Sequence, residues 1–463
     1  MRIEVAGAGA GKTTNMAAHI LSRDIPRGKV VYCVAFTNAA ANNISSRIEQ
    51  ICGSVPLNIK VSTIHSFLYS ELIQPYYHLL YGKHYQGVSV IELPADQKYR
   101  NARIQELDSN NLLHQTAIPQ RAKWLVDKKS KDSVKVKRTR MSILKLFAGY
   151  CHALFVDEAQ DIDSNMKAIL LALDHAGVEM NLYGDPKQDV RGFGCLRELI
   201  NACDNVSYIH ECHRCPALHL LLSNTLASDS EKQVADNSNC TGSINVYLES
   251  ETDVRKLISA QQYGLVYISR KNNRFETHAV ANRSDNPHFD TLFHEVRLAV
   301  SKKYASDATS IEIERMAFNA SKQMVAAISD GDKPQYVLNS WIQRRIFDYS
   351  AATYAKVIAA LRCATKPVSR TAIPVSSIEA VKGLESEKCL FILTLDLAPY
   401  LFGQNSQDNR MKHLLYVALT RSLDNLSILI AKEVEERYSR RQLMLLEKGR
   451  LDISLESDAS GCK

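Results

Sequence analysis

Short apolar runs recur along this chain, and glycine-rich, polar or acidic residues follow most of them. The runs span residues 2–5, 29–35, 58–62, 151–156, 179–183, 265–269 and 426–431. Near-continuous apolar runs are typical of parallel strands that helices cover on both faces. The segment after the first run, residues 15–23, has the pattern of a helix. We therefore predict an α/β fold with parallel sheets.

Length and composition narrow the class of protein. A chain of 463 residues is long enough for two to four domains, and 45% hydrophobic with 23% charged residues is ordinary for a globular protein. We find no apolar run of membrane-spanning length and no secretory signal, so we expect no membrane association. The eleven cysteines are scattered, which favours reduced thiols in a cytoplasm. The net charge of +7 only weakly favours binding to polyanions.

A phosphate-binding loop follows the first apolar run. Its residues are Ala6, Gly7, Ala8, Gly9, Ala10, Gly11, Lys12, Thr13 and Thr14. Glycines let backbone N–H groups surround phosphates, and the helix that follows presents its positive end to them. We expect Lys12 to reach the β- and γ-phosphates and Thr13 to bind Mg²⁺. The alternative is a glycine-rich turn with a solvated lysine.

Acidic residues follow the strand predicted at 151–156. Asp157 can hold Mg²⁺, and Glu158 can polarise an attacking water molecule. Two like charges at a strand end are costly unless a cation lies nearby, and Lys12 would be that cation. Gln188 follows the strand at 179–183 and is placed to sense a γ-phosphate or orient water. We predict that ATP is the substrate and Mg²⁺ the cofactor.

Polar residues also follow the strands at 29–35 and 58–62. Phe36, Thr37 and Asn38 come after the first, and Thr63 and His65 come after the second. Ligands bind at the carboxyl ends of strands in open α/β sheets. The alternative is structural, because threonine and asparagine are common helix N-caps and a lone histidine is more often a surface residue.

A basic segment lies within a long helical region that starts near residue 69. Residues 121–140 contain nine lysines or arginines against two aspartates, with Trp124 among them. Cations with an aromatic ring suit single-stranded nucleic acid. A solvated loop fits the composition equally well.

Two cysteines and two histidines cluster in residues 210–215 (HECHRC). Zinc is one interpretation, but this single Cys-x-x-Cys has no complementary second pair. We favour the motif interpretation that follows.

The order of these motifs resembles the core of superfamily 1A helicases, the family of UvrD, Rep and PcrA. Three later stretches match further family motifs: residues 211–215 (ECHRC), 377–385 (SIEAVKGLE) and 415–421 (LYVALTR). The motifs extend from residue 6 to residue 421. The resemblance implies two RecA-like P-loop NTPase domains, each with a mostly helical insertion. The implied boundaries are 1–68 with 146–203, insertion 69–145, 204–275 with 366–452, short insertion 276–365, and a tail at 453–463.

The resemblance also implies roles for individual residues. The catalytic set would be Lys12, Asp157, Glu158, Gln188, Arg214 and Arg421. Arg214 and Arg421 would touch the γ-phosphate, and Glu385 the ribose. The DNA contacts would be Phe36, Thr37, Asn38, Thr63, His65, Phe193 and Arg270.

The chain departs from the family pattern at three places. The chain begins two residues before Ile3, so the glutamine motif that reads adenine is missing, and we expect relaxed base selectivity. Gly194 stands where an arginine is usual, although Arg191 could swing into that space, and Glu379 stands where a histidine is usual. Both changes weaken attraction to a phosphate backbone. We therefore expect DNA-stimulated hydrolysis with weak strand separation by the isolated chain.

A narrower resemblance rests on residues 70–75 (SELIQP) and 184–188 (GDPKQ) and on the small size of the chain. They are similar to the helicase-like subunit of the Gabija antiphage defence system, which implies an OLD-family nuclease as partner. We expect docking through residues 121–140 or the region 341–345. The alternatives are a 3′–5′ helicase of DNA repair or recombination, and a non-catalytic DNA or protein adaptor that retains the fold.

Overall fold

The computed structural model describes residues 1–94, 96–127, 132–236, 241–278, 287–304, 308–364 and 373–444. Residues 128–131 of the basic segment and the predicted tail at 453–463 lie outside these ranges. Contacts divide the chain into two compact units. The larger comprises 1–84, 116–279 and 373–463, and the smaller comprises 85–115 and 280–372.

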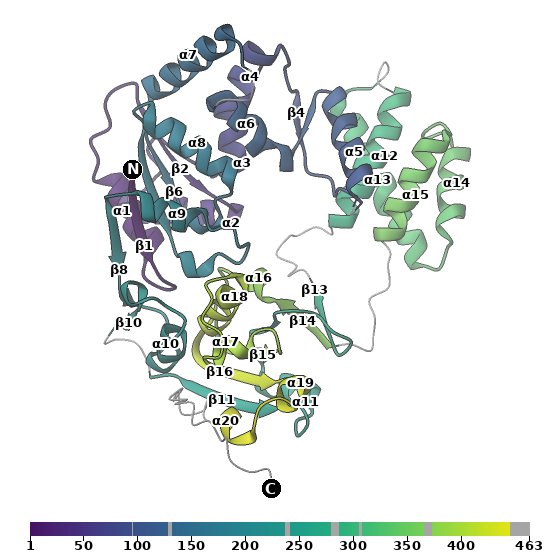
Figure 1. The fold of residues 1–463 in the computed structure, drawn as a ribbon. Helices are drawn as coiled ribbons and strands as arrows, with labels where there is room; N and C mark the ends of the chain where they lie inside the picture. The colour runs from purple at the N-terminus through teal and green to yellow at the C-terminus, as the bar shows by residue number, and fades with distance from the viewer. Residues whose placement is uncertain are drawn as a thin grey trace. The chain divides into compact units, whose positions relative to one another are not determined.

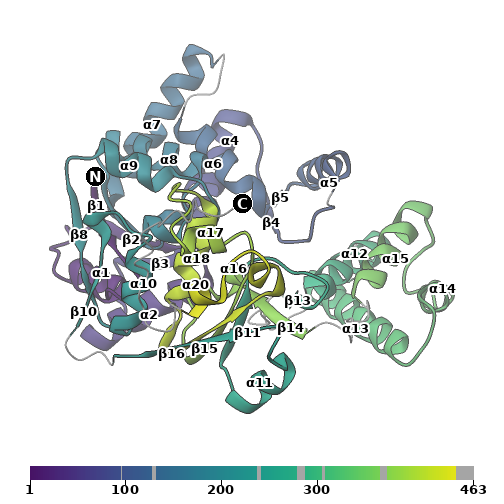
Figure 2. The ribbon, with the colours of Figure 1, turned by 60° about the horizontal axis from the view of Figure 1, so that its bottom comes forward.

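The first part of the larger unit is built on a parallel sheet, which has six strands within the described residues. Its order is β3-β2-β6-β7-β1-β8. The strands are β1 (Arg2–Ala6), β2 (Val30–Ala35), β3 (Ile59–Thr63), β6 (Cys151–Val156), β7 (Glu179–Gly184) and β8 (Val206–Ile209). The flanking helices are α1 (Lys12–Leu21), α2 (Asn38–Cys52), α8 (Ser164–His175) and α9 (Cys195–Ala202). Figures 1 and 2 show these helices around the sheet.

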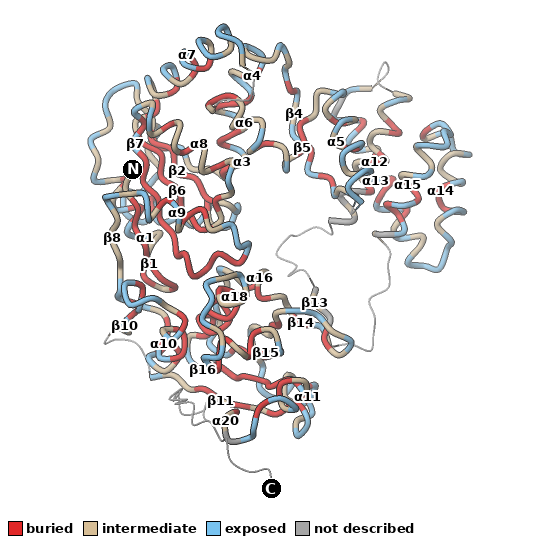
Figure 3. Tube along the Cα trace, viewed as in Figure 1, coloured by how far each residue is buried: buried red, intermediate tan, exposed pale blue. Residues whose placement is uncertain are grey.

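The core of this domain explains why the apolar runs form strands. Cys33 and Phe155 on neighbouring strands are fully buried against Met16 and Ile20 of α1. The inner strands are buried along almost their whole length (Figure 3). Alternating β and α elements with both sheet faces covered give the parallel arrangement that the sequence predicts.

The second part of the larger unit repeats the plan. Its sheet, again counted over the described residues, has the order β11-β16-β15-β12-β14-β13. The strands are β11 (Ser243–Leu248), β12 (Leu265–Ile268), β13 (Phe275–His278), β14 (Ile373–Ser377), β15 (Ser386–Leu393) and β16 (Ser422–Ile430). The helices are α10 (Ala217–Asn224), α11 (Val254–Gln261), α16 (Ile378–Val381), α17 (Ala398–Leu401), α18 (Arg410–Leu419), α19 (Lys432–Glu435) and α20 (Arg440–Met444). The chain thus contains two RecA-like α/β domains, as predicted.

Helices inserted in the first domain begin directly after β3. They are α3 (Ile64–Phe67), a π-helical stretch (Leu68–Ile73), α4 (Gln74–Tyr81), α6 (Ile118–Val126) and α7 (Val134–Tyr150). Within the described part of the basic segment, Arg140 is buried and pairs with Asp132 at 2.9 Å. The Arg121 guanidinium lies 4.4 Å from the centre of the Trp124 ring, and Tyr81 packs against that ring.

The smaller unit joins two distant stretches of sequence. It contains β4 (Gly87–Ser89), α5 (Gln97–Ser109), β5 (Leu112–His114), α12 (Pro287–Tyr304), α13 (Ser310–Ser329), α14 (Pro334–Gln343) and α15 (Ala351–Ala364). Arg103 of α5 is buried and pairs with Glu295 of α12 and with Glu106, which Lys356 of α15 also contacts at 2.8 Å. The sequence pattern does not predict that residues 85–115 pack with 280–372.

Candidate nucleotide site and DNA track

The phosphate loop lies between β1 and α1. Gly9 and Gly11 have φ of 72° and 71°, in the left-handed region that favours glycine. A β-carbon at Gly9 would lie 2.4 Å from Cβ of Arg214, so this position also requires a small residue. Lys12 Nζ donates to the carbonyl of Ala6 at 3.1 Å, which holds the amine over the loop. The glycines therefore shape the loop and admit a close neighbour from the second domain.

Thr13 and Asp157 form the pair that would hold Mg²⁺. The Thr13 hydroxyl donates to Asp157 Oδ2 at 3.2 Å, and Asp157 is 3% exposed at the end of β6. Burial and the neighbouring Glu158 raise the pKa of Asp157 to about 6, against the opposing charge of Lys12. A hydroxyl and a carboxylate are the hard oxygen donors that Mg²⁺ prefers, so these residues fit the ion.

Glu158 has the environment of an ionised base. Burial opposes its ionisation, but Lys12, Lys382 and other donors outweigh that effect and lower its pKa. Its backbone has φ of 54°, which turns the chain directly after β6. The Gln160 amide donates to the Glu158 carboxylate. A carboxylate that stays ionised can accept a proton from water.

Gln188 is buried in a polar network after β7. Its amide donates to Asp185 Oδ2 at 3.0 Å, and Lys187 pairs with Asp185 at 3.0 Å. The backbone N–H of Asp185 donates to the Gln160 side chain at 3.1 Å, which connects this network to Glu158. The structure thus holds Gln188 beside Asp185, while its predicted contact with water or phosphate stays a prediction.

The second domain contributes the two predicted arginines. Arg214 Nε pairs with Glu385 at 2.6 Å. Arg421 is 1% exposed, and burial together with Arg214 lowers its pKa. It donates to the carbonyl of Val417 at 3.0 Å, the carbonyl of Leu384 at 3.4 Å and the hydroxyl of Thr420 at 2.9 Å. Arg421 also lowers the pKa of Glu158, so its charge acts on the acidic pair of the first domain.

Lys382 lies beside the candidate site, and the sequence analysis gives it no individual role. Its amine pairs with Asp161 at 2.7 Å, and both side chains are about nine-tenths buried. The contact connects the segment after α16 to the short helix after Glu158. A lysine within the 377–385 motif was the available signal.

Three predicted DNA contacts come together on the first domain. Phe36, His65 and Phe193 line a cavity of about 70 Å³ with Arg191. Burial and Arg191 lower the pKa of His65, so this ring is neutral near pH 7. The Arg191 guanidinium lies 6.0 Å from the centre of the Phe193 ring. Arg191 therefore lies near Phe193, and its movement into the space of the cation missing at Gly194 stays a prediction.

Thr37 and Thr63 have the structural role that we gave as the alternative. The Thr37 hydroxyl accepts from the N–H of Ala40 at 3.1 Å and caps α2. The Thr63 hydroxyl accepts from the N–H of Ser66 at 3.3 Å and caps α3. Asn38 is exposed in the first turn of α2. Thr37 and Thr63 therefore have a structural role as N-caps. DNA contacts of these two residues and of Asn38 stay predictions.

Arg270 lines a different cavity, at the carboxyl edge of the second sheet. This cavity of about 500 Å³ is bordered by Arg270, Lys271, Asp396, Glu433 and Arg437. Its lining contains no other predicted DNA contact.

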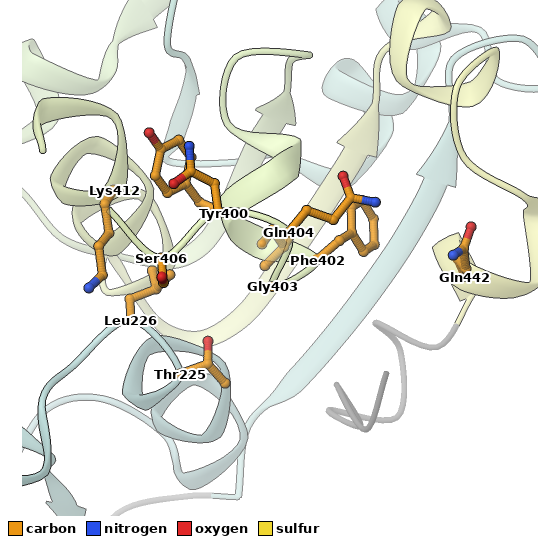
Figure 4. A pocket seen from close by; sticks show the side chains of 11 residues that line it. Thr225, Leu226, Tyr400, Phe402, Gly403, Gln404, Ser406, Lys412 and Gln442 are labelled. Carbon is orange, nitrogen blue, oxygen red and sulfur yellow. The ribbon is translucent and has the colours of Figure 1, made fainter. Parts of the chain in front are cut away.

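A third cavity lies in the second domain beside α17 (Figure 4). It has a volume of about 300 Å³, and Thr225, Tyr400, Gln404 and Lys412 are among the residues that line it. None of the predicted site residues borders it, so it is separate from the nucleotide site.

The structure does not support the interpretation of residues 210–215 as a zinc site. Cys212 and Cys215 are buried, whereas His213 is exposed and contacts Asp236 at 2.9 Å. Within the described residues, the group that could hold a metal is Glu211, His213 and Asp236, which contains no cysteine.

The fold and the site together define a P-loop NTPase core with helicase-like motifs. Residues 2–194 match the model of a family described as "AAA domain", which covers the first RecA-like domain and its insertion. Over 107 residues the chain is 36% identical to ATP-dependent DNA helicase srs2 of Schizosaccharomyces pombe. That stretch is 22% of this chain, and the chain spans only 11% of that relative's length. The family match thus covers less than half of the chain, and the helicase match covers about a fifth of it.

Two solved structures are similar over most of the chain. One is a complex of Arterivirus nonstructural protein 10 (helicase) with DNA, with a TM-score of 0.36 and 12% identity, covering 96% of this chain and 63% of that one. The other is the PRRSV helicase, with a TM-score of 0.35 and 11% identity, covering 93% and 52%. Similarity at this level carries no argument about function. Within the described residues, no helix is long and apolar enough to cross a membrane.

Proposed function

We propose that this protein hydrolyses ATP with Mg²⁺ in a reaction that DNA stimulates. The observation that carries the proposal is the meeting of two sets of side chains. Lys12, Thr13 and Asp157 come from the first domain, and Arg214 and Arg421 come from the second. Phosphoryl transfer needs a metal and several cations around the developing charge. This arrangement supplies the cations, and Thr13 and Asp157 supply oxygen ligands for the metal.

Each residue has a chemical task in this proposal. Thr13 and Asp157 would hold Mg²⁺, which would neutralise phosphate charge. Glu158 accepts the proton of the attacking water, with Gln188 as the residue that orients it. Arg214 exchanges Glu385 for the γ-phosphate, and the freed Glu385 turns to the ribose. Arg421 places a second positive charge behind Arg214.

The first experiment compares Lys12→Ala with Lys60→Ala in a phosphate-release assay with Mg²⁺, with and without single-stranded DNA. Lys60 is exposed on β3 and serves as the matched control. We expect Lys12→Ala to lose hydrolysis by at least about 100-fold, because a cation at the transferring group is removed. Equal rates in both variants would mean that the fold serves as a non-catalytic adaptor.

Use of GTP and deoxynucleotides beside ATP is part of the proposal. The residues that the site brings together address phosphates and metal rather than a base, which supports it. A site that hydrogen-bonds one base rejects others strongly. We therefore expect kcat/KM for ATP and GTP to agree within about tenfold, and a preference of 100-fold would contradict this.

We further propose weak strand separation by the isolated chain, supported by the missing cation at Gly194. Unwinding of a duplex with a 3′ single-stranded tail, measured beside hydrolysis, tests this. Processive unwinding by the purified protein would favour a DNA repair helicase instead.

A nuclease partner of the OLD family, in a Gabija-type defence complex, completes the proposal. One face of α7 supports a protein partner. Val134 and Met141 are 66% and 70% exposed there. Lys137, Arg138 and Lys145 are exposed at positions three, four and eleven residues after Val134, so they share this face. Exposed apolar side chains among cations suit an acidic protein surface better than a phosphate backbone.

Co-purification from the native host tests the partner. We expect a nuclease to accompany the wild-type chain, and a variant with Lys137 and Lys145 both changed to Glu to lose it. Lys60→Glu is the control for added negative charge. Recovery of the wild-type chain from the native host without a nuclease would contradict this part of the proposal.

A further inference from the structure

Both backbone groups of Ala8, in the middle of the phosphate loop, are bonded to side chains of the second domain. The N–H of Ala8 donates to the Tyr416 hydroxyl at 3.3 Å, and the Gln233 amide donates to the Ala8 carbonyl at 3.1 Å. The Tyr416 hydroxyl donates in turn to Gln233 Oε1 at 2.9 Å. Three hydrogen bonds therefore close a ring around Ala8, which we call the Ala8 ring.

The second domain fixes the backbone of Gln233. Asn224 of α10 bonds both backbone groups of Gln233, at 2.9 Å to its N–H and 2.8 Å to its carbonyl. Gln233 and Tyr416 are 4% and 2% exposed. The Lys187 amine, which comes from the first domain, lies 5.1 Å from the centre of the Tyr416 ring. The Ala8 ring is therefore part of a buried contact between the two domains.

The Ala8 ring also explains a glycine of the loop. A β-carbon at Gly7 would lie 2.1 Å from Gln233 Oε1, and the nearest three heavy atoms all belong to Gln233. Gly7 does not have a positive φ, so backbone conformation does not demand glycine there. A larger residue at this position would displace the end of the Gln233 side chain.

We infer that Gln233 and Tyr416 are positioning residues that hold the phosphate loop in register with Arg214 and Arg421. The inference rests on the proposed hydrolysis at this site. Arg214 approaches the same loop closely at Gly9, so a shift of the loop against the second domain moves the phosphates away from the arginines. An error of about 1 Å in such a geometry costs up to about 100-fold in rate.

Steady-state kinetics of Gln233→Ala and Tyr416→Phe test the inference, with Gln261→Ala as control because Gln261 is exposed on α11. We expect kcat to fall about 10- to 100-fold in both variants with KM for ATP within about threefold. The melting temperature is measured in parallel. A fall in kcat that only follows lost folded protein would contradict a positioning role.

Non-additivity at Gly7 is a second readout. A methyl group at residue 7 overlaps the end of the Gln233 side chain and should displace it, so Gly7→Ala should slow hydrolysis about as much as Gln233→Ala does. The double variant should then be hardly slower than either single variant. Losses that multiply in the double variant would overturn the link between Gln233 and the loop.

Hydrogen exchange separates this inference from the proposed function. In nucleotide-free protein, the peptide that covers residues 6–11 should exchange faster in Gln233→Ala and Tyr416→Phe than in wild type or Gln261→Ala. If wild type lacks hydrolysis but this peptide responds, the proposed function fails while the Ala8 ring stands. Unchanged exchange in both variants overturns the inference even if wild type hydrolyses ATP.

Discussion

Arg410 pairs with Glu379 at 2.5 Å while its Nε donates to the carbonyl of Val190 at 2.8 Å. Glu379 stands where the superfamily 1A helicases that the sequence resembles keep histidine. The sequence does not predict a cation beside this negative charge, and Arg410 supplies one. The pairing removes one of the two reasons to expect weak DNA coupling, and Gly194 is the reason that stays.

Glu379→Gln should therefore strengthen binding to single-stranded DNA. The change removes an anion and releases the Arg410 guanidinium for a phosphate. Because the pair is partly exposed, we expect a gain of about two- to tenfold and a steeper salt dependence. Fluorescence anisotropy at two salt concentrations measures both. Glu387→Gln, at an exposed position of the same domain, is the control, and an equal gain there would contradict a specific role for Arg410.

Alanine substitutions of Arg214 and Arg421, the two arginines of the candidate nucleotide site, should differ in their effect on folding stability. Arg214→Ala should lower kcat by about 1,000-fold with little change in melting temperature, because its partner Glu385 is exposed. Arg421→Ala should lower kcat and also cost about 2–4 kcal/mol of folding free energy, since three buried hydrogen bonds are lost. Thermal unfolding beside kinetics measures this. Equal destabilisation would show that Arg214 is structural too.

Lys382→Met should destabilise the protein, because it leaves Asp161 buried without its cation. Removing one partner of a buried pair costs about 3–5 kcal/mol, whereas replacing both partners can be nearly neutral. The double variant Asp161→Asn/Lys382→Met should therefore recover most of the loss in a denaturant titration. A double variant as unstable as Lys382→Met would mean that Lys382 acts on another group, such as Glu158.

His294 should make the smaller unit sensitive to acid. Burial, Arg103 and Arg297 lower the pKa of His294 to about 4, and its Nε2 is buried without a partner among the described residues. The unfolded histidine titrates near 6.5, so the unfolded state binds more protons between about pH 4 and 6.5. Stability must then fall as pH decreases through that window, by about 1–3 kcal/mol.

Unfolding measured at pH 7 and pH 4.5 tests this prediction. His294→Gln should reduce the difference in stability between the two pH values. His175→Gln, which changes an exposed histidine of α8, should retain it. An unchanged pH dependence in His294→Gln would mean that other groups carry the proton uptake.

The sequence predicts those parts of the site that depend on local order. Strand, loop and helix follow one another at residues 2–21, so Lys12 and Thr13 could be placed before the structure was known. Asp157 could be placed too, because a buried strand fixes the edge at which it emerges. Pairs such as Lys382 with Asp161, or Gln233 with Ala8, join residues more than 200 positions apart. No periodicity encodes such a pair, since it depends on how two domains meet.

The sequence also does not show which distant stretches pack together in the smaller unit. Helix α5 lies within the long region that the sequence predicts as helical, but its polar composition does not show which helices cover it. Arg103 is buried only because Glu295 lies opposite. A charged residue near an apolar stripe is more often exposed, so the buried pair was not foreseeable.

The pairing of Arg103 with Glu295 has a consequence for the synthesis of the chain. Residues 85–115 leave the ribosome before their partner stretch 280–372, with residues 116–279 made in between. At about 5–20 residues per second this delay lasts roughly 10 to 30 s. During that time Arg103 and the rest of α5 have no partner helices, and the segment is open to chaperones and proteases. The smaller unit therefore stays incomplete until most of the chain has been translated.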